Sequence, residues 1–264
     1  MSDRVRAVDL LPSGPIRVME RNLVAYRRAW LIFISGFLEP VLFLLSIGIG
    51  VGGLVGTVPG PGGELVSYRD FVAPGLMATA AMNGAVLDTT FMFFIKLKYW
   101  GVFHSMLATP LSPSQIVVGE VVWSVMRGGI YAVFFLVTMT AMGLVASPWA
   151  ILALPAAVLI CWAFAGAGAA GASFMRSYID FDLVNLVLIP SFLFSGVFFP
   201  LDRYPEWLAW VVRCTPLYQG VALIRDLTFG EIGPLLLVHA AYLLVLGAFG
   251  LRLASRRMAR LLTP

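Results

Sequence analysis

The chain has 264 residues, of which 60% are hydrophobic and only 12% are charged. Soluble domains usually contain about 45–50% apolar and about 25% charged residues, so this composition excludes a soluble fold and leaves apolar surface to face lipid. The net charge of +4 does not indicate nucleic-acid binding, because the basic residues cluster beside apolar segments, as at the cytoplasmic ends of membrane spans. The two cysteines, Cys161 and Cys214, are too few for a disulfide framework.

Near the N-terminus, residues 15–28 are predicted to form an amphipathic helix. Ile16, Met19, Leu23 and Tyr26 repeat there at helical spacing, and such a helix can lie along a membrane surface. An ordinary soluble helix is the alternative, which the apolar span directly after it disfavours. The preceding polar tail lacks the apolar core of a cleavable signal peptide.

Six segments are long and apolar enough to cross the hydrocarbon core, which needs about 20 residues. The charge-free stretch between Gly128 and Met175 is too long for one span and is divided at Ser147 and Pro148. The predicted spans are 29–51, 71–95, 115–144, 149–174, 183–199 and 232–251. The sequence therefore predicts an all-α polytopic membrane protein, with a single domain over residues 1–264.

The basic residues predict the orientation of these spans, since cytoplasmic flanks are enriched in arginine and lysine. Of the 18 basic residues, Arg69, Arg203, Arg213 and Arg225 are assigned to the outer side, Arg127 lies inside a span, and the remainder are assigned to the cytoplasmic side. We therefore expect a multi-pass protein of a bacterial cytoplasmic (inner) membrane with both termini in the cytoplasm.

The cytoplasmic connection over residues 96–114 is predicted to contain a short helix, on which Phe103 and Leu107 belong to one apolar stripe. The third span then begins with Ser112 as its cap and Gln115 three residues later, which is the pattern of a capping box.

The outer connection over residues 201–231 is predicted to form two short helices, 205–213 and 217–227. Trp207 and Trp210 are suited to a membrane interface. A plain exposed loop is the alternative, but nearly half of the stretch is large and apolar, which favours a partly embedded hairpin.

The sequence lacks the common catalytic and cofactor motifs. A P-loop needs a Gly-Lys pair, whereas Lys96 and Lys98 follow Ile95 and Leu97. The GAGAAG run at 166–171 lies in an apolar span without the strand–turn–helix context of a dinucleotide site, so it predicts close helix packing. The GIGVGG run at 48–53 is interpreted as a loosened helix end. We expect no catalytic residue, metal site or cofactor in this chain.

Three charged residues, Glu39, Asp88 and Arg127, fall inside predicted spans at similar depths. A charge at the bilayer centre costs at least about 2.5–3.5 kcal/mol, so such groups need partners or water. We expect an intramembrane polar network in which Arg127 pairs with Asp88 or Glu39. One interpretation is that the pair only fixes helix packing; the other is a polar switch or substrate contact. Because Pro40 follows Glu39, a local kink is also expected.

Several segments resemble one known family. They are FLEPVLFLLSIGIGVGG at 37–53, FVAPGLMATAAMNGAVLDTTF at 71–91, MLATPLSPSQIVVGE at 106–120, LIPSFLFSGVFFPLDRYPEWL at 188–208 and TPLYQGVALIRDLTFGE at 215–231. Through these segments and the order in which they occur, the chain resembles the permease subunits of type-2 ABC exporters (ABC-2 family). The resemblance is close to the permeases of Nod-factor export and daunorubicin-resistance systems.

The resemblance implies six spans, an amphipathic connecting helix before the first, a coupling helix after the second and two short outer re-entrant helices before the sixth. It also implies pairing with a second permease, either another copy or a paralogue, and a cytoplasmic ABC ATPase that binds ATP and Mg. Membrane lipids are the remaining expected partner. The residues expected to contact the ATPase are Arg17, Arg21, Trp100, Phe103, His104 and Leu107.

The resemblance further implies export of a hydrophobic or amphipathic compound, which could be a drug, a lipid or a lipid-linked glycan. Candidates for the substrate path are Phe91, Phe93, Phe94, Phe192 and Phe194, with packing in the core or against lipid as the alternative for each. An ion-coupled secondary transporter would require inverted repeats, and an intramembrane enzyme would require a nucleophile or metal cluster. A scaffold for an ATPase that transports nothing is a further alternative.

Overall fold

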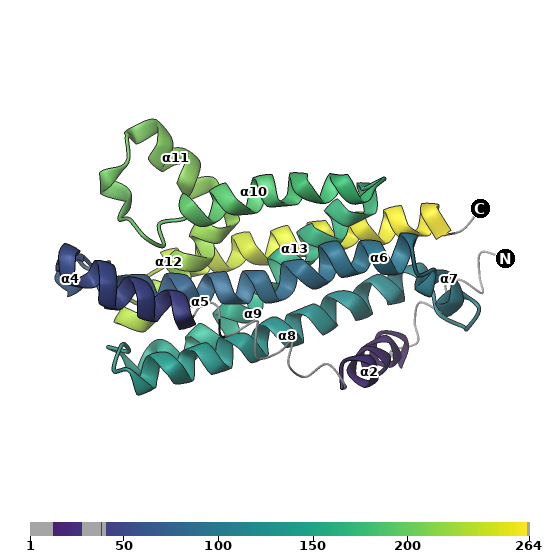
Figure 1. Ribbon diagram of the computed structural model, residues 1–264, viewed down its shortest axis with the longest axis horizontal. Helices are drawn as coiled ribbons and strands as arrows, with labels where there is room; N and C mark the ends of the chain where they lie inside the picture. Colours follow the sequence, from purple (N-terminus) through teal and green to yellow (C-terminus); the bar gives the residue numbers. More distant parts are fainter. Residues whose placement is uncertain (1–12, 28–37, 39–40, 263–264) are drawn as a thin grey trace.

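The computed structural model describes residues 13–27, 38 and 41–262. Long helices run side by side along an elongated bundle, with α10 and α11 at its margin (Figure 1). The helix α2, the short helix α7 and the last turns of α13 lie toward one end of the bundle, and α4 lies toward the other. In the described part of the chain, four helical segments are long and apolar enough to cross a membrane: Tyr68–Lys98, Pro113–Ala141, Pro148–Phe174 and Leu235–Leu262.

These four segments match the second, third, fourth and sixth predicted spans. The first of them joins α5 (Tyr68–Leu87), the π-helical turn η2 (Asp88–Met92) and α6 (Phe93–Lys98). It begins before the predicted residue 71 because the Ser67 side chain caps the helix by accepting a hydrogen bond from the Asp70 backbone N–H at 3.3 Å. It also continues past residue 95, because Lys96 is buried within the bundle.

The other three segments are α8 (Pro113–Ala141), the 3₁₀ turn η3 (Pro148–Leu152) with α9 (Ala153–Phe174), and α13 (Leu235–Leu262). The predicted capping box of α8 is confirmed: Ser112 Oγ accepts from the Gln115 backbone N–H at 3.3 Å, and Gln115 Oε1 accepts from the Ser112 backbone N–H at 3.1 Å. These two bonds satisfy backbone donors that a helix start otherwise leaves unpaired.

The first and fifth predicted spans are described only in part or are shorter than expected. Within the first, residues 29–37 and 39–40 lie outside the described residues. Its final part contains the π-helical turn η1 (Ile47–Val51) and α4 (Gly52–Val55), in agreement with a loosened end. The fifth is α10 (Phe181–Leu193), which follows the 3₁₀ turn η4 (Tyr178–Asp180) and ends before residue 199. The prediction of six spans therefore stays a prediction.

One small element departs from the all-α prediction. The segment expected to be a loop after the first span contains a hairpin of β1 (Thr57–Pro59) and β2 (Leu65–Ser67), which pair antiparallel with Val58 opposite Val66. The chain can reverse here because Gly63 adopts a positive φ of 84°, a conformation that glycine reaches without steric penalty.

The connecting helices lie close to their predicted positions. They are α2 (Ser13–Tyr26), α7 (Val102–Leu107), the 3₁₀ turn η5 (Leu201–Arg203), α11 (Glu206–Cys214) and α12 (Pro216–Phe229). α12 begins at a Thr215 cap with Pro216 in its first turn, and Gly230 ends it in the left-handed conformation, which is the common arrangement of helix ends.

The helix α9 lies at the centre of the bundle and packs against α5, α8 and α13. A Cβ atom at Gly166 would overlap the carbonyl of Gly247, and one at Gly250 would overlap the Gly166 backbone. The GAGAAG run therefore serves close helix packing, as predicted. Cys161 is buried and Cys214 is exposed, and both are free thiols.

Candidate functional site

The structure brings Asp88 and Arg127 together inside the bundle. Arg127 Nη1 lies 2.6 Å from Asp88 Oδ1, and Arg127 Nε donates a hydrogen bond to the Tyr131 hydroxyl at 2.8 Å. Both charged side chains are buried. The hydroxyl of Tyr26 donates to the same Asp88 oxygen at 3.3 Å, which links α2 to the pair. Glu39, the third charge expected in this network, lies outside the described residues.

A second buried ion pair was not predicted. Lys96 Nζ lies 2.6 Å from Glu120 Oε2 and donates a hydrogen bond to Asn22 Oδ1 at 3.2 Å. Asn22 and Glu120 are each 1% exposed and Lys96 is 4% exposed. The predicted start of the connection at residue 96 is therefore too early, because Lys96 still lies in α6 and is buried in the bundle. The sequence signal that could have revealed the pair is the opposite charge of the two residues near facing ends of consecutive helices.

The helix α2 packs lengthwise on the first half of α8. Its Val18, Asn22 and Tyr26 recur every four residues, which places them on one face. Val18 covers Gly119, where any Cβ would overlap its side chain. The Tyr26 ring lies 5.2 Å from the Trp123 ring between centroids. The helix predicted to lie along the membrane surface is thus held by side chains that contact both ion pairs.

Each carboxylate of the two ion pairs uses only one of its oxygens. In the part of the chain that the structure describes, Asp88 Oδ2, Glu120 Oε1 and Asn22 Nδ2 are buried without a hydrogen-bond partner. An unpaired buried polar atom costs about 1–3 kcal/mol, so the network is held below its full bonding capacity.

The helix α2 also borders a surface groove of about 460 Å³ beside α7. Arg17, Arg21 and Trp100 line it, with Val102 and Met106 of α7 at its apolar wall. The groove thus unites three of the residues expected to contact an ATPase.

The other three predicted contact residues all lie on α7 but differ in exposure. His104 is exposed, Leu107 is half-buried, and Phe103 is fully buried with its ring 5.0 Å from that of Phe93. The ring of Phe103 therefore anchors α7 and is not part of the accessible surface.

The phenylalanines proposed for a substrate path are distributed over the molecule. Phe91 packs on Tyr178 and Phe181, and Phe94 is buried beside Tyr99. Phe192 and Phe194 lie at the far end of α10. Phe192 contacts Phe43 and Phe198, and Phe194 contacts Tyr204. The structure does not bring these residues onto one common surface.

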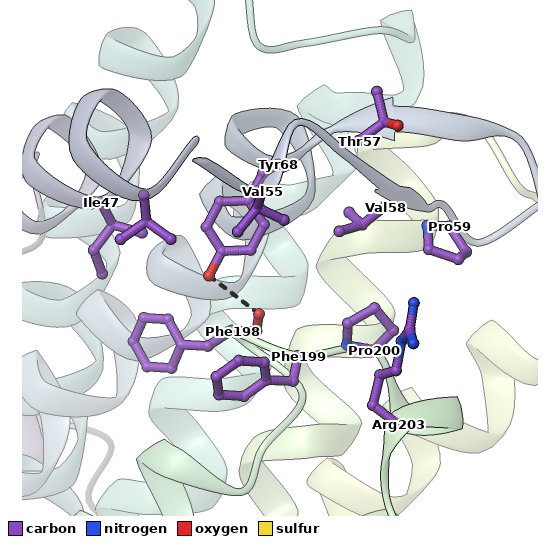
Figure 2. Close-up of a pocket in the computed structure, with 11 residues that line it drawn as sticks. Ile47, Val55, Thr57, Val58, Pro59, Tyr68, Phe198, Phe199, Pro200 and Arg203 are labelled. Atoms are coloured by element: carbon purple, nitrogen blue, oxygen red, sulfur yellow. Dashed lines mark hydrogen bonds between the residues drawn. The ribbon is translucent and has the colours of Figure 1, made fainter. Parts of the chain in front are cut away.

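At the opposite end of the bundle from α7, a cavity of about 560 Å³ lies between η1, α4, the β hairpin and residues 198–203. Figure 2 shows the Tyr68 hydroxyl directed at the Phe198 carbonyl, to which it donates at 3.2 Å, with the Phe199 ring beside it. Arg203 extends beside Pro200 toward the hairpin. This pocket, called here the hairpin pocket, is aliphatic and aromatic, with one cationic side chain at its edge.

The helix α12 is fixed at this end of the bundle by Arg225. Its Nη2 donates to the carbonyls of Phe71 at 3.1 Å and Gly196 at 2.8 Å, and its guanidinium lies 3.9 Å from the centroid of the Phe71 ring. A basic residue that the orientation rule assigns to an outer loop is therefore buried, where it joins α12 to α5 and to the turn after α10. Among the described residues, no cluster of His, Cys, Asp or Glu could hold a metal ion.

The long apolar helices, the buried ion pairs and the short helices between spans define a polytopic helical membrane protein whose polar groups serve helix contacts. Residues 16–229 match the ABC-2 type transporter family. The chain belongs to this family, whose members are membrane components of transporters.

Relatives in this family cover most of the chain. It is 33% identical over 230 residues to nodulation protein J of Rhizobium leguminosarum bv. trifolii, an alignment that spans 85% of this chain and 86% of the relative. It is 29% identical over 245 residues to nodulation protein J of Sinorhizobium fredii, with 91% and 92% covered. The inner membrane transport permease YadH of Escherichia coli is 25% identical over 223 residues, with 82% of both chains covered.

Proposed function

We propose that this chain is the permease subunit of an ATP-driven exporter of hydrophobic or amphipathic compounds, and that a separate cytoplasmic ATPase binds ATP and Mg. Family membership and the likeness to nodulation protein J and to a transport permease support this role. Both termini are cytoplasmic in this proposal, which puts α2 and α7 on the ATPase side and the hairpin pocket on the outer side. A second permease, identical or paralogous, completes the pathway.

The observation that carries the proposal is the position of α2 between the groove and the buried ion pairs. Arg17 and Arg21 border the groove with Trp100, while Asn22 and Tyr26 of the same helix contact the two ion pairs. Arg21 Nη1 also donates a hydrogen bond to Asn22 Oδ1 at 3.1 Å. An ATPase seated in the groove would therefore move a helix that is bonded to the charged centre of the bundle. Because the network is under-bonded, ATP-driven movement of α2 can rearrange it and change the packing of α5 against α8.

Docking is tested by reversing charge in the groove. The tagged chain is expressed with its ATPase and purified gently. Arg17→Glu with Arg21→Glu is expected to reduce the recovered ATPase at least about tenfold, since apposed like charges oppose association by several kcal/mol. Arg256→Glu with Arg260→Glu is the matched control, because these arginines are also exposed and four residues apart on a helix at the same end of the bundle. Equal loss of ATPase in both double variants would contradict the assignment of the groove.

Transmission through α2 is tested with Asn22→Leu, which removes the contacts of Asn22 with Lys96 and Arg21 but keeps every residue that lines the groove. We expect the ATPase to bind normally and transport in reconstituted vesicles to fall. Collapse of ion gradients with an ionophore should leave transport by the unmodified complex unchanged. Transport that requires the gradient and no ATP would favour an ion-coupled secondary transporter instead.

A further inference from the structure

A second cavity in the bundle, of about 610 Å³, lies between α9 and α10 and is called here the α9–α10 slot. Gly168 and Gly171 of α9 form one wall, Val184 and Val187 of α10 form the other, and Val86 and Thr90 contribute the floor. α10 lies at the margin of the bundle (Figure 1), and none of its residues is buried. Gly168 packs closely against Thr89, whereas a Cβ at Gly171 would meet no atom within 4 Å, so α10 stands away from this part of α9.

The interior of the slot offers no free hydrogen-bonding group to a ligand. The Thr90 hydroxyl donates to the Val86 carbonyl at 2.6 Å, and the Ser191 hydroxyl donates to the Val187 carbonyl at 2.7 Å. The remaining side chains between the two ends are apolar. Because a polar group placed there would lose its bonds to water without replacement, the occupant of the interior must be hydrocarbon.

The dimensions suit a single hydrocarbon chain. From Phe164 to Phe174, which line the slot near its ends, α9 rises about 15 Å, or half of the roughly 30 Å hydrocarbon core. The slot therefore extends over the depth of about one leaflet, which suits one acyl chain.

One end of the slot carries two guanidinium groups. Arg176 lines it directly, while Arg257 stacks 4.1 Å from the centroid of the lining Phe174 ring and donates from Nε to the Ser173 carbonyl at 3.3 Å. The acidic residue at this end, Asp180, accepts from the backbone N–H groups of Arg176 at 2.7 Å and Ser177 at 3.1 Å.

The hydrogen bonds from the backbone N–H groups of Arg176 and Ser177 lower the pKa of Asp180, as does the nearby charge of Arg176, and one carboxylate oxygen, Oδ2, accepts both bonds. In the described ranges, no salt bridge engages either arginine side chain. Guanidinium groups bind phosphate through paired N–H donors, so this end of the slot complements a phosphate at the membrane interface.

We propose that the α9–α10 slot is a phospholipid-binding site, in which one acyl chain lies between the two helices and the phosphate is bound by Arg176 and Arg257. Its placement in the cytoplasmic leaflet depends on the orientation proposed for the chain. Lipid binding itself requires neither the ATPase nor a transported compound.

The site is tested by photolabelling the purified chain in nanodiscs. The probe is phosphatidylcholine with a diazirine midway along one acyl chain, and the comparison probe is diacylglycerol with the same chain. We expect the phospholipid to label the slot-lining residues of α9 and α10 severalfold more than diacylglycerol does. Leu186, which is exposed on α10 and does not line the slot, serves as the internal reference for general contact with lipid.

Variants then separate the slot from the rest of the lipid-facing surface. A Cβ at Gly171 meets no atom within 4 Å, so Gly171→Phe fills the slot without a backbone clash, and labelling of the lining residues should fall severalfold. Gly129→Phe on α8, where a Cβ meets only one atom at 3.8 Å, is the matched control and should leave it unchanged. Arg176→Gln should reduce phospholipid labelling to the diacylglycerol level, whereas Arg256→Gln should not.

The proposal is overturned by slot labelling that survives Gly171→Phe, or by equal labelling with the two probes. A change of oligomeric state in Gly171→Phe with unchanged labelling would assign the slot to contact between copies. Should Gly171→Phe fail to give a monodisperse protein, Ala167→Leu blocks the same slot with a smaller side chain. The labelling experiment uses the chain without its ATPase. A failed ATPase-docking experiment would therefore not change how the labelling result is interpreted.

Discussion

The neighbouring helices α9 and α10 are both almost wholly apolar, yet their surroundings differ completely. Most residues of α9 are buried, among them Ile160 and Ala169, whereas none in α10 is. α9 owes its burial to small residues that let α5, α8 and α13 approach closely. The contrast teaches that apolar composition places a helix in the membrane but does not determine whether protein or lipid covers it.

The largest expected effect lies in the packed part of the bundle. Arg127→Met leaves Asp88 as an uncompensated buried charge, which should destabilise the fold by about 3–5 kcal/mol. The measurement is the midpoint of unfolding in detergent under increasing denaturant. Exchanging the charges, as Asp88→Arg with Arg127→Asp, should recover part of the loss. A double exchange that is no more stable than either single variant would show that the pair does not act as a unit.

A smaller loss is expected from Ile160→Ala in α9. This fully buried side chain contacts Gly220 of α12, where a Cβ would overlap it. Its removal should cost about 2–5 kcal/mol through lost burial and a residual cavity. The same unfolding measurement applies, with Val158→Ala on the exposed side of α9 as control. Equal losses of stability in both variants would show that the two sides of α9 are packed alike.

The smallest effect is expected from Leu186→Ala in α10, whose side chain is 67% exposed. Substitutions away from packed features usually change stability by no more than about 0.5 kcal/mol, and the isolated chain should behave in this way. A loss above about 1 kcal/mol, or one that grows with protein concentration, would show that another protein chain covers α10.

Patterns local in sequence predicted most of the fold. Local sequence predicted the capping box of Ser112 and Gln115 and the break at Pro148, and helical segments begin at both places. The opposite charges and similar depths of Asp88 and Arg127 suggested that they pair, and the two side chains form an ion pair. The short β hairpin was missed because three-residue strands carry almost no periodic signal.

The missing parts of the candidate site depend on tertiary contacts. Lys96 follows the flanking pattern of a cytoplasmic lysine, and only the approach of α2 and α8 turns it into a buried partner of Glu120. Asn22 belongs to no motif in the sequence, and its role arises only from the packing of α2 against α8. The α9–α10 slot has no counterpart in the sequence, since it is defined by the separation of two helices.

The turn η2 determines how the two ion pairs align, as the number of residues between their charges shows. On α8 the partners Glu120 and Arg127 are seven residues apart, which returns an α-helix to within about 20° of the same direction. Lys96 and Asp88 are eight apart, which in a regular α-helix would turn one away from the other by about 80°. A π turn accommodates one additional residue, so η2 restores the common direction. Deleting one residue between Asp88 and Lys96 is therefore expected to remove the π turn and to leave the two charges seven residues apart, as on α8.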